Sequence, residues 1–508
     1  MLNQLKTGAA LTYISLGLGY IISIVYTPVM LRLLGQSEYG LYNLVASVVS
    51  YLGLFNFGFG SAYIRYYSYY KAEDNCKDIA NLNGMFLIIF SIIGFIAIVA
   101  GTVLIINIDL VLGHQLTRQE ITTASILMTI MTFNIAISFP NVVFNSNIIA
   151  NENFVFQKTI ELIRTVVNPF LILPVLFLGY GSIGMVVATT SLNVAIQITN
   201  IIFCFKKLNM KFSFQQFDIS LMKEITIFSS YLFINMIIDQ INWNVDKFIL
   251  GRFHGTVAVA LYGLGALINT YYLSLSVAIS NVFIPRVNRM VVTKNDNKDL
   301  TELFIRVGRI QFIILSLISS GFIFFGQPFI SMWAGNDYKD TYFITLLLII
   351  PVTIPLIQNI GIEIQKAKNI HQFRTWVYLF IAVANILISI PMVKSHEGIG
   401  AALGTAISLI IGNVIIMNWY YHKKVGLNMR EFWGQIIRIV PALFPPIFIG
   451  ILMILFIDID NFKMFLLLGL IYIIVFSIFM WFFGMNQYEK NLIRKPARKV
   501  FNRFGIFR

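Results

Sequence analysis

Long apolar stretches recur along the whole 508-residue chain, and this recurrence limits the possible fold more than any other feature of the sequence. A helix rises ~1.5 Å per residue, so about 20 apolar residues are needed to cross ~30 Å of bilayer hydrocarbon. Hydrophobic residues make up 57% of the chain and charged residues only 12%, which is unlike a soluble protein. We therefore predict an all-α polytopic membrane protein with fourteen transmembrane helices. The predicted spans are residues 9–31, 41–64, 82–106, 122–149, 159–179, 182–205, 225–250, 257–284, 304–326, 341–364, 374–393, 399–420, 435–457 and 462–484.

The basic residues support this count, because cytoplasmic loops of membrane proteins are enriched in Lys and Arg. When alternate loops are assigned to opposite sides, 30 of the 37 Lys and Arg residues fall on the side that holds both termini. We expect both termini to be cytoplasmic, in a bacterial inner membrane. This bias and the attraction of anionic lipid explain the net charge of +14, so no nucleic-acid partner is expected. The five His residues are scattered and predict no metal site.

The chain also contains an internal repeat. At an offset of 220 residues, RLLGQSEYGLYNLVA (32–46) aligns without a gap with RFHGTVAVALYGLGA (252–266). The aligned pairs include Arg32 with Arg252, Gly35 with Gly255, and Tyr42 with Tyr262. Parallel repeats of this kind are common in transporters. We predict two pseudo-symmetric six-helix lobes, with the following boundaries: an N-lobe at 1–211, a C-lobe at 212–424, two extra helices at 425–484 and a basic cytoplasmic tail at 485–508.

Several segments resemble the polysaccharide transporter branch of the multidrug, oligosaccharidyl-lipid and polysaccharide exporter superfamily. They are LLGQSEYGLYNL, LFNFGFGSAYIRYYSYY, NVDKFILGRFHG and QNIGIEIQKAKNIHQF. The resemblance implies two lobes around a central cavity that opens alternately to either side, with the first and seventh helices lining it. It also implies an O-antigen or capsule repeat-unit flippase, not an enzyme, that moves an undecaprenyl-pyrophosphate-linked oligosaccharide. A polysaccharide polymerase and glycosyltransferases are the partners expected to act beside it.

Four polar residues interrupt the apolar span at 225–250: Asn235, Asp239, Asn242 and Asp246. Their spacing of 4, 3 and 4 places them within about 60° of one helix face. A carboxylate near the centre of a span costs at least ~2.5 kcal/mol, so this face is expected to meet a wet cavity or a partner helix. We predict that Asp239 binds Na⁺ or H⁺ as a coupling ion, and no other cofactor is expected. A purely structural pairing of Asp239 is the alternative.

A pyrophosphate requires cations, and Arg suits it because its planar group holds phosphate oxygens in pairs. The candidates near the predicted cytoplasmic ends of helices are Arg65, Arg164, Arg306 and Arg309. A topogenic or snorkelling role is the alternative for each, and Arg164 and Arg309 are the favoured candidates because they lie deepest along their helices. Asn56, between Phe55 and Phe57 in the second predicted helix, is a candidate for contact with sugar.

Three other functions compete with the flippase interpretation. A cation-coupled multidrug exporter of the same superfamily usually has twelve helices, and this chain is predicted to have fourteen. A peptidoglycan-precursor flippase has fourteen but carries arginines in its first two helices, whereas this chain has no charge between Lys6 and Arg32 or between Glu38 and Arg65. A membrane glycosyltransferase or polymerase is expected to carry a large outer loop, which is missing between the predicted spans.

Overall fold

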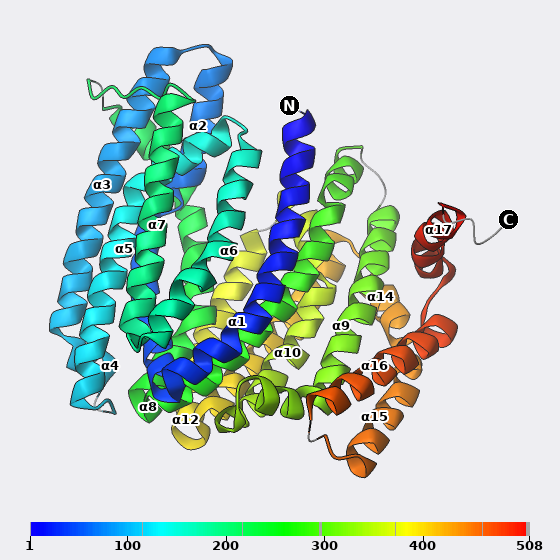
Figure 1. Cartoon of the computed structure of the whole chain (residues 1–508). Helices are drawn as coiled ribbons and strands as arrows, with labels where there is room; N and C mark the ends of the chain where they lie inside the picture. Colours follow the sequence, from blue (N-terminus) through cyan, green and yellow to red (C-terminus); the bar gives the residue numbers. More distant parts are fainter. Residues whose placement is uncertain are drawn as a thin grey trace. The chain divides into compact units, whose positions relative to one another are not determined.

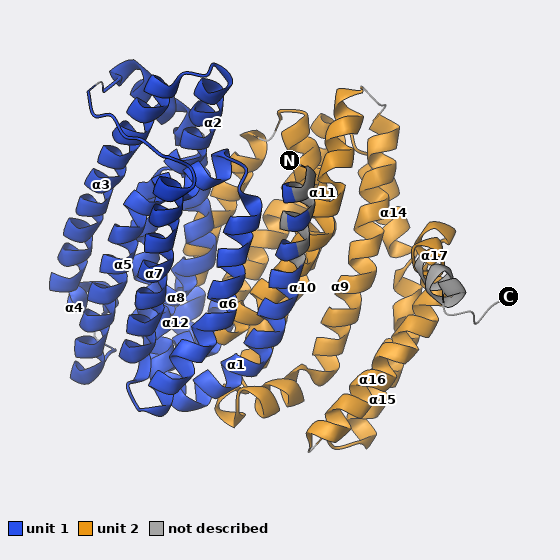
Figure 2. Cartoon of the chain, turned by 45° about the horizontal axis from the view of Figure 1, so that its top comes forward, with its two compact units in different colours: residues 1–263, 390–401 blue, residues 264–389, 402–508 orange. Residues whose placement is uncertain are grey.

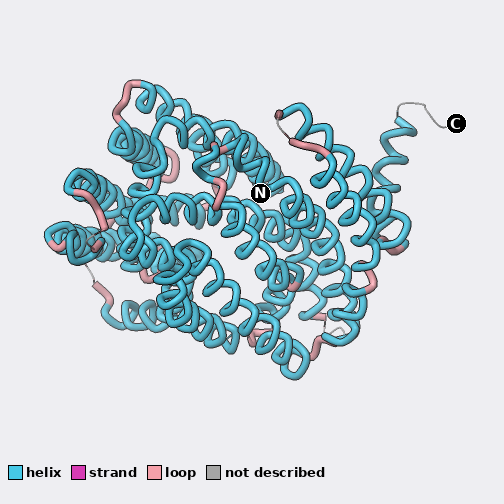
Figure 3. The backbone as a smooth tube through the Cα atoms, turned by 90° about the horizontal axis from the view of Figure 1, so that it is seen from below, coloured by secondary structure: helices cyan, strands magenta, loops and turns pink. Residues whose placement is uncertain are grey.

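The computed structural model describes residues 2–113, 115–215, 217–293, 297–370, 372–459 and 461–503, and their regular structure is helical throughout (Figures 1 and 3). The α-helices are α1 (Leu2–Ser50), α2 (Phe59–Ala72), α3 (Cys76–Ile106), α4 (Ile108–Leu112), α5 (Arg118–Ala150), α6 (Phe154–Phe177), α7 (Gly181–Lys206), α8 (Ile219–Val292), α9 (Asn297–Trp333), α10 (Thr341–Ile357), α11 (Asn359–Ala367), α12 (Gln372–Leu409), α13 (Asn418–Tyr420), α14 (Met429–Ile437), α15 (Phe444–Phe456), α16 (Phe462–Phe479) and α17 (Gln487–Arg503). Short 3₁₀ and π segments lie at η1 (Tyr51–Asn56), η2 (Asn336–Tyr338), η3 (Ile410–Met417), η4 (Tyr421–Val425), η5 (Val440–Leu443) and η6 (Met480–Gly484).

Three of these helices are each two helices joined at a sharp break. The backbone leaves the helical conformation at Gly35 in α1, at Gly255 in α8, and at His396 and Glu397 in α12. The aligned glycines of the sequence repeat adopt the same left-handed conformation, with φ of 73° at Gly35 and 78° at Gly255. A glycine tolerates this conformation because it has no Cβ. The repeat is therefore present in the backbone geometry as well as in the sequence.

The predicted number of spans is confirmed. Within the described residues, ten helical stretches are long and apolar enough to cross a membrane, or up to eleven if the bent pair α10 and α11 is one span. Three stretches are long enough for two crossings each, which accounts for the fourteen predicted helices: Ile14–Ala72, Ile219–Val292 and Gln372–Val425.

The chain forms two compact units, coloured separately in Figure 2. Unit 1 contains residues 1–263 and 390–401, and unit 2 contains residues 264–389 and 402–508. The units divide at Gly263 and not at residue 211, because the first arm of α8 and its turn pack with α1. This division into units does not test the lobe boundaries that the repeat predicts, and they remain a prediction.

Each unit has its own aromatic core. In unit 1, Tyr63, Phe86 and Phe90 are fully buried between α2 and α3. In unit 2, Phe304 of α9 packs against Phe432 of α14, with ring centroids 4.6 Å apart. Buried aromatic rings of this size contribute much of the packing energy of a helical bundle.

Two elements differ from the sequence prediction. The second predicted helix is interrupted, because η1 ends at Asn56 and both Phe57 and Gly58 have positive φ before α2 begins. The predicted tail forms α17 up to Arg503, and its remaining residues lie outside the described part of the chain.

Candidate functional site

A polar cavity of about 640 Å³ lies inside unit 1 among α5, α6 and α7. We call it the amide pocket, because Asn and Gln side chains dominate its lining. The lining residues are Asn134, Ile135, Ser138, Asn141, Asn145, Ile148, Gln157, Lys158, Ile160, Glu161, Arg164, Asn193, Ile196, Gln197 and Asn200.

The helix periodicity of the sequence places these polar side chains on facing stripes. On α5, Asn134, Ser138, Asn141 and Asn145 are spaced by 4, 3 and 4 residues, so they share one face. The stripe on α7 consists of Asn193, Gln197 and Asn200, and that on α6 of Gln157, Glu161 and Arg164. Polar faces of membrane helices avoid lipid and meet inside the bundle or at water.

The stripe on α5 extends about 16 Å, since its eleven residue steps each rise ~1.5 Å. It reaches from the end of α5 at Ala150 toward the middle of the predicted span. The cavity is therefore elongated along the helices and lies nearer to the membrane side that the basic residues predict to be cytoplasmic.

The pocket combines amides with a charged rim. Lys158 Nζ donates to Glu161 Oε2 at 2.6 Å, and the exposed Arg164 lies one turn further along α6. Inside, Asn193 Nδ2 is 3.4 Å from Asn134 Oδ1, while Gln197 and Asn200 are buried. The Oδ1 atom of Asn141 is also buried, and it accepts no hydrogen bond from the described residues. Amides both donate and accept hydrogen bonds, so this lining suits a ligand rich in hydroxyl groups beside an anionic group.

Of the predicted site residues, the structure brings only Arg164 into this pocket. The amides were missed, although the spacing of 4, 3 and 4 that marked residues 235–246 also occurs at 134–145. That spacing is the signal in the sequence, but neutral amides in an apolar helix mark a polar face less clearly than carboxylates do.

The predicted stripe on the first arm of α8 is not uniform. Asn235 and Asn242 are half-buried and Asp239 is exposed. Asp246, however, is 2% exposed, and its Oδ2 accepts a 2.7 Å hydrogen bond from Tyr262 Oη. Asp246 thus lies inside the protein against the second arm of α8, unlike the other three residues of the predicted stripe. Asp239 stays a candidate for ion coupling.

The other predicted arginines make contacts away from the amide pocket. Arg65, exposed on α2, lies over the Phe228 ring at 5.0 Å. Arg306 is ion-paired with Glu302 and lies over the Tyr488 ring at 4.9 Å. It also lines a second cavity with Arg286 and Arg289 in unit 2. The interrupted second helix leaves Asn56 with its Oδ1 atom buried and without a hydrogen bond from the described residues.

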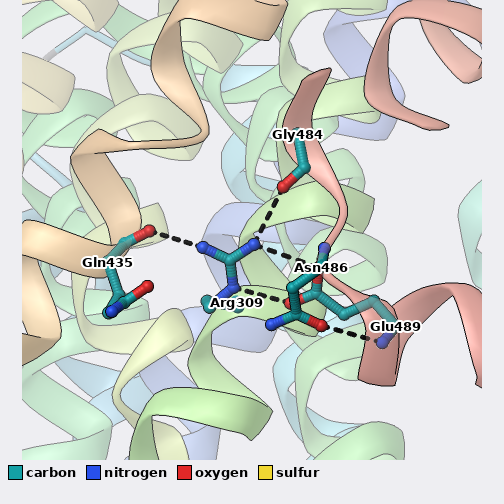
Figure 4. Close-up of polar contacts among 5 residues, drawn as sticks. All are labelled: Arg309, Gln435, Gly484, Asn486 and Glu489. Atoms are coloured by element: carbon teal, nitrogen blue, oxygen red, sulfur yellow. Dashed lines mark hydrogen bonds and ion pairs between the residues drawn. The ribbon is translucent and has the colours of Figure 1, made fainter. Parts of the chain in front are cut away.

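Arg309 differs from the expectation that it faces a substrate cavity. Its Nε and Nη2 atoms form a two-pronged salt bridge to Glu489 at 2.6 and 3.0 Å (Figure 4). The same guanidinium donates to the carbonyl oxygens of Gln435 and Gly484 at 2.7 and 2.8 Å. Both charged side chains are at most 5% exposed, so Arg309 connects α9, α14, η6 and α17 and is not available to a substrate.

The two repeat turns, residues 32–46 and 252–266, contact each other through residues 37–40 and 256, which all lie in unit 1. Glu120 Oε1 accepts hydrogen bonds from Ser37 Oγ at 2.7 Å and from Thr256 Oγ1 at 2.9 Å. A Cβ added at Gly40 would collide with the Thr256 carbonyl oxygen, so the two backbones approach directly there. Arg32 and Arg252 are both exposed, and Arg252 donates a hydrogen bond to Leu110 O at 2.9 Å. Tyr42 is half-buried. The repeat residues thus build a closed contact at the membrane side opposite the N-terminus.

Comparison with known proteins identifies the family. Residues 5–291 match the family described as polysaccharide biosynthesis protein, which is more than half of the chain. The chain belongs to this family. A Shigella flexneri protein described as an O-antigen transporter is 21% identical to this family member over 404 residues, covering 78% of this chain and 92% of that protein. The uncharacterized membrane protein EpsK of Bacillus subtilis (strain 168) is 20% identical over 501 residues, covering 95% and 96%.

Solved structures with the same fold are also known. The lipid II flippase MurJ in an inward closed conformation gives a TM-score of 0.74 at 18% identity, covering 93% of this chain and 97% of that chain. An inward-facing multidrug resistance transporter of the MATE family gives 0.67 at 12% identity, covering 83% and 99%. The family match and the two relatives agree with the resemblance to the polysaccharide transporter branch seen in the sequence, and the solved structures share the fold.

Proposed function

We propose that this membrane transporter is a flippase that moves an undecaprenyl-pyrophosphate-linked oligosaccharide repeat unit from the inner to the outer leaflet of a bacterial inner membrane by alternating access. The amide pocket carries this proposal. A glycan offers many hydroxyl groups, and the amides of α5 and α7 supply donors and acceptors for them. Arg164 supplies positive charge for a phosphate at the rim, where Lys158 is ion-paired with Glu161.

The repeat turns support the alternating cycle. Their direct contact at Gly40 and Thr256, reinforced by Glu120, lies in the part of α1 remote from the N-terminus. With both termini in the cytoplasm, we propose that this contact forms part of a seal toward the outside. Substrate would then enter the pocket from the cytoplasmic side, where the lipid-linked unit is made by partner glycosyltransferases.

Asp239 is proposed to couple this cycle to Na⁺ or H⁺. It is exposed within the first arm of α8, where a bound cation would neutralise its carboxylate in one state of the cycle. Transport by Asp239→Asn under Na⁺ and pH gradients tests this role. An unchanged response to both gradients would leave Asp239 with a structural role only.

Binding of lipid-linked oligosaccharide to the purified protein tests the pocket itself, measured by native mass spectrometry. Gln197→Leu and Asn200→Leu remove buried amides from α7, so we expect roughly tenfold weaker binding, as about 1.4 kcal/mol is lost per hydrogen bond to the ligand. Thr199→Val is the matched control, because Thr199 is exposed, does not line the pocket and donates a hydrogen bond to Ala195 O of its own helix. Equal binding by all three variants would contradict the proposal.

A further inference from the structure

The C-terminal helix α17 has no place in the transport cycle above, and its position is unusual. It begins at Gln487, directly after α16 and η6, which form a candidate membrane span from Phe462 to Gly484. Only Met485 and Asn486 separate the two elements. Figure 1 shows that α17 turns away from the direction of α16. We expect a helix that starts where a span ends and runs across it to lie at the level of the lipid headgroups.

The surface of α17 has two chemically different faces. At ~100° per residue, Glu489, Leu492 and Ile493 lie within about 100° of one another. Lys490 and Lys495 flank this face on either side, and Arg494 lies opposite it. Leu492 is 47% exposed and Ile493 is 50% exposed, so the described protein does not cover the apolar face.

The salt bridge to Arg309 fixes which way these faces point. Glu489 is turned into unit 2, so Leu492 and Ile493, one turn further on, continue on the same side beyond the edge of the bundle. Asn486 strengthens this geometry by capping the helix, since its Oδ1 accepts from Glu489 N at 2.9 Å. The same salt bridge neutralises Glu489, the only acidic residue in a segment that carries six Lys and Arg residues between 487 and 503.

We propose that α17 is an interfacial helix that binds anionic lipid headgroups. Leu492 and Ile493 insert at the boundary of the hydrocarbon, while Lys490 and Lys495, which flank the apolar face, contact the phosphate groups. Amphipathic helices with flanking cations bind membranes in this way, by apolar burial together with attraction to acidic lipid. The Arg494 guanidinium lies 5.2 Å from the centre of the Trp481 ring, and Trp is typical of the same membrane–water boundary.

The test uses the full-length protein in nanodiscs, with spin labels on single cysteines in a Cys76→Ser background; Cys204 is buried and stays in place. Nanodiscs of phosphatidylcholine alone are compared with nanodiscs that also contain phosphatidylglycerol. With the anionic lipid, we expect a label at Ile493→Cys to be reached by oxygen severalfold more than by a water-soluble nickel reagent. A label at the exposed Asn491→Cys, on the opposite face, is the matched control and should stay accessible to nickel.

Charge removal separates the lipid partner from simple apolar insertion. Lys490→Gln together with Lys495→Gln should restore nickel access at position 493 in the anionic nanodiscs. A label at position 493 that is open to water in both lipids would overturn the proposal. The proposal would also be overturned if the label were protected from nickel equally well in phosphatidylcholine alone. The same holds if the label stayed protected after both lysines were replaced by glutamine. None of these readouts depends on transport.

Discussion

At the residue scale, the contrast between Arg306 and Arg309 shows that depth along a helix does not define a role. The two residues are one turn apart on α9, yet Arg306 is partly exposed and Arg309 is buried with Glu489. Removing one partner of a buried pair leaves an uncompensated charge and costs ~3–5 kcal/mol, whereas an exposed pair contributes ~0–1 kcal/mol. We expect Arg309→Ala to lower the melting temperature of the detergent-solubilised protein by several degrees and Arg306→Ala to change it little. Equal melting temperatures for the two variants would show that the Arg309 network does not stabilise unit 2.

At the element scale, the repeat turns are expected to control which side of the protein is closed. Gly40→Ala would push its new Cβ into the Thr256 carbonyl and separate the turns. We expect a cysteine at the buried Ala260 to react severalfold faster with a water-soluble maleimide in this variant. Gly17→Ala is the control, because its Cβ would have no neighbour within 4 Å. If the cysteine at position 260 reacted at an unchanged rate in Gly40→Ala, the contact between the repeat turns would not control which side of the protein is closed.

The sequence predicts the membrane-spanning helices well, because the thickness of the bilayer requires long apolar stretches that are easy to recognise. The equivalence of Gly35 and Gly255 was also visible in the alignment of the two repeats, and both glycines have positive φ in the structure. The break at Asn56 was not predicted, because its flanking residues are as apolar as those of a continuous helix. The partner of Arg309 could not be predicted either, since Glu489 is 180 residues away and only the tertiary fold brings the two together.

At the scale of the whole molecule, the proposed cargo determines the energetics. A pyrophosphate diester carries about two negative charges, and each charge that moves outward across an inside-negative membrane releases ~2.3 kcal/mol per 100 mV. The membrane potential alone could therefore drive export. Ion coupling through Asp239 is a second proposed source of energy. The two sources are distinguished by Asp239→Asn, which should alter the response to Na⁺ and pH gradients only if ion coupling contributes.

The most direct measurement of the central claim is flipping of a fluorescent undecaprenyl-pyrophosphate-linked oligosaccharide in proteoliposomes under an imposed potential. The label on the glycan is quenched from outside, so its arrival in the outer leaflet is followed over time. We predict flipping well above that of protein-free liposomes, faster when the interior is negative, and reduced by Gln197→Leu with Asn200→Leu but not by Thr199→Val. Flipping no faster than in protein-free liposomes, with the protein folded and correctly inserted, would contradict the proposed function.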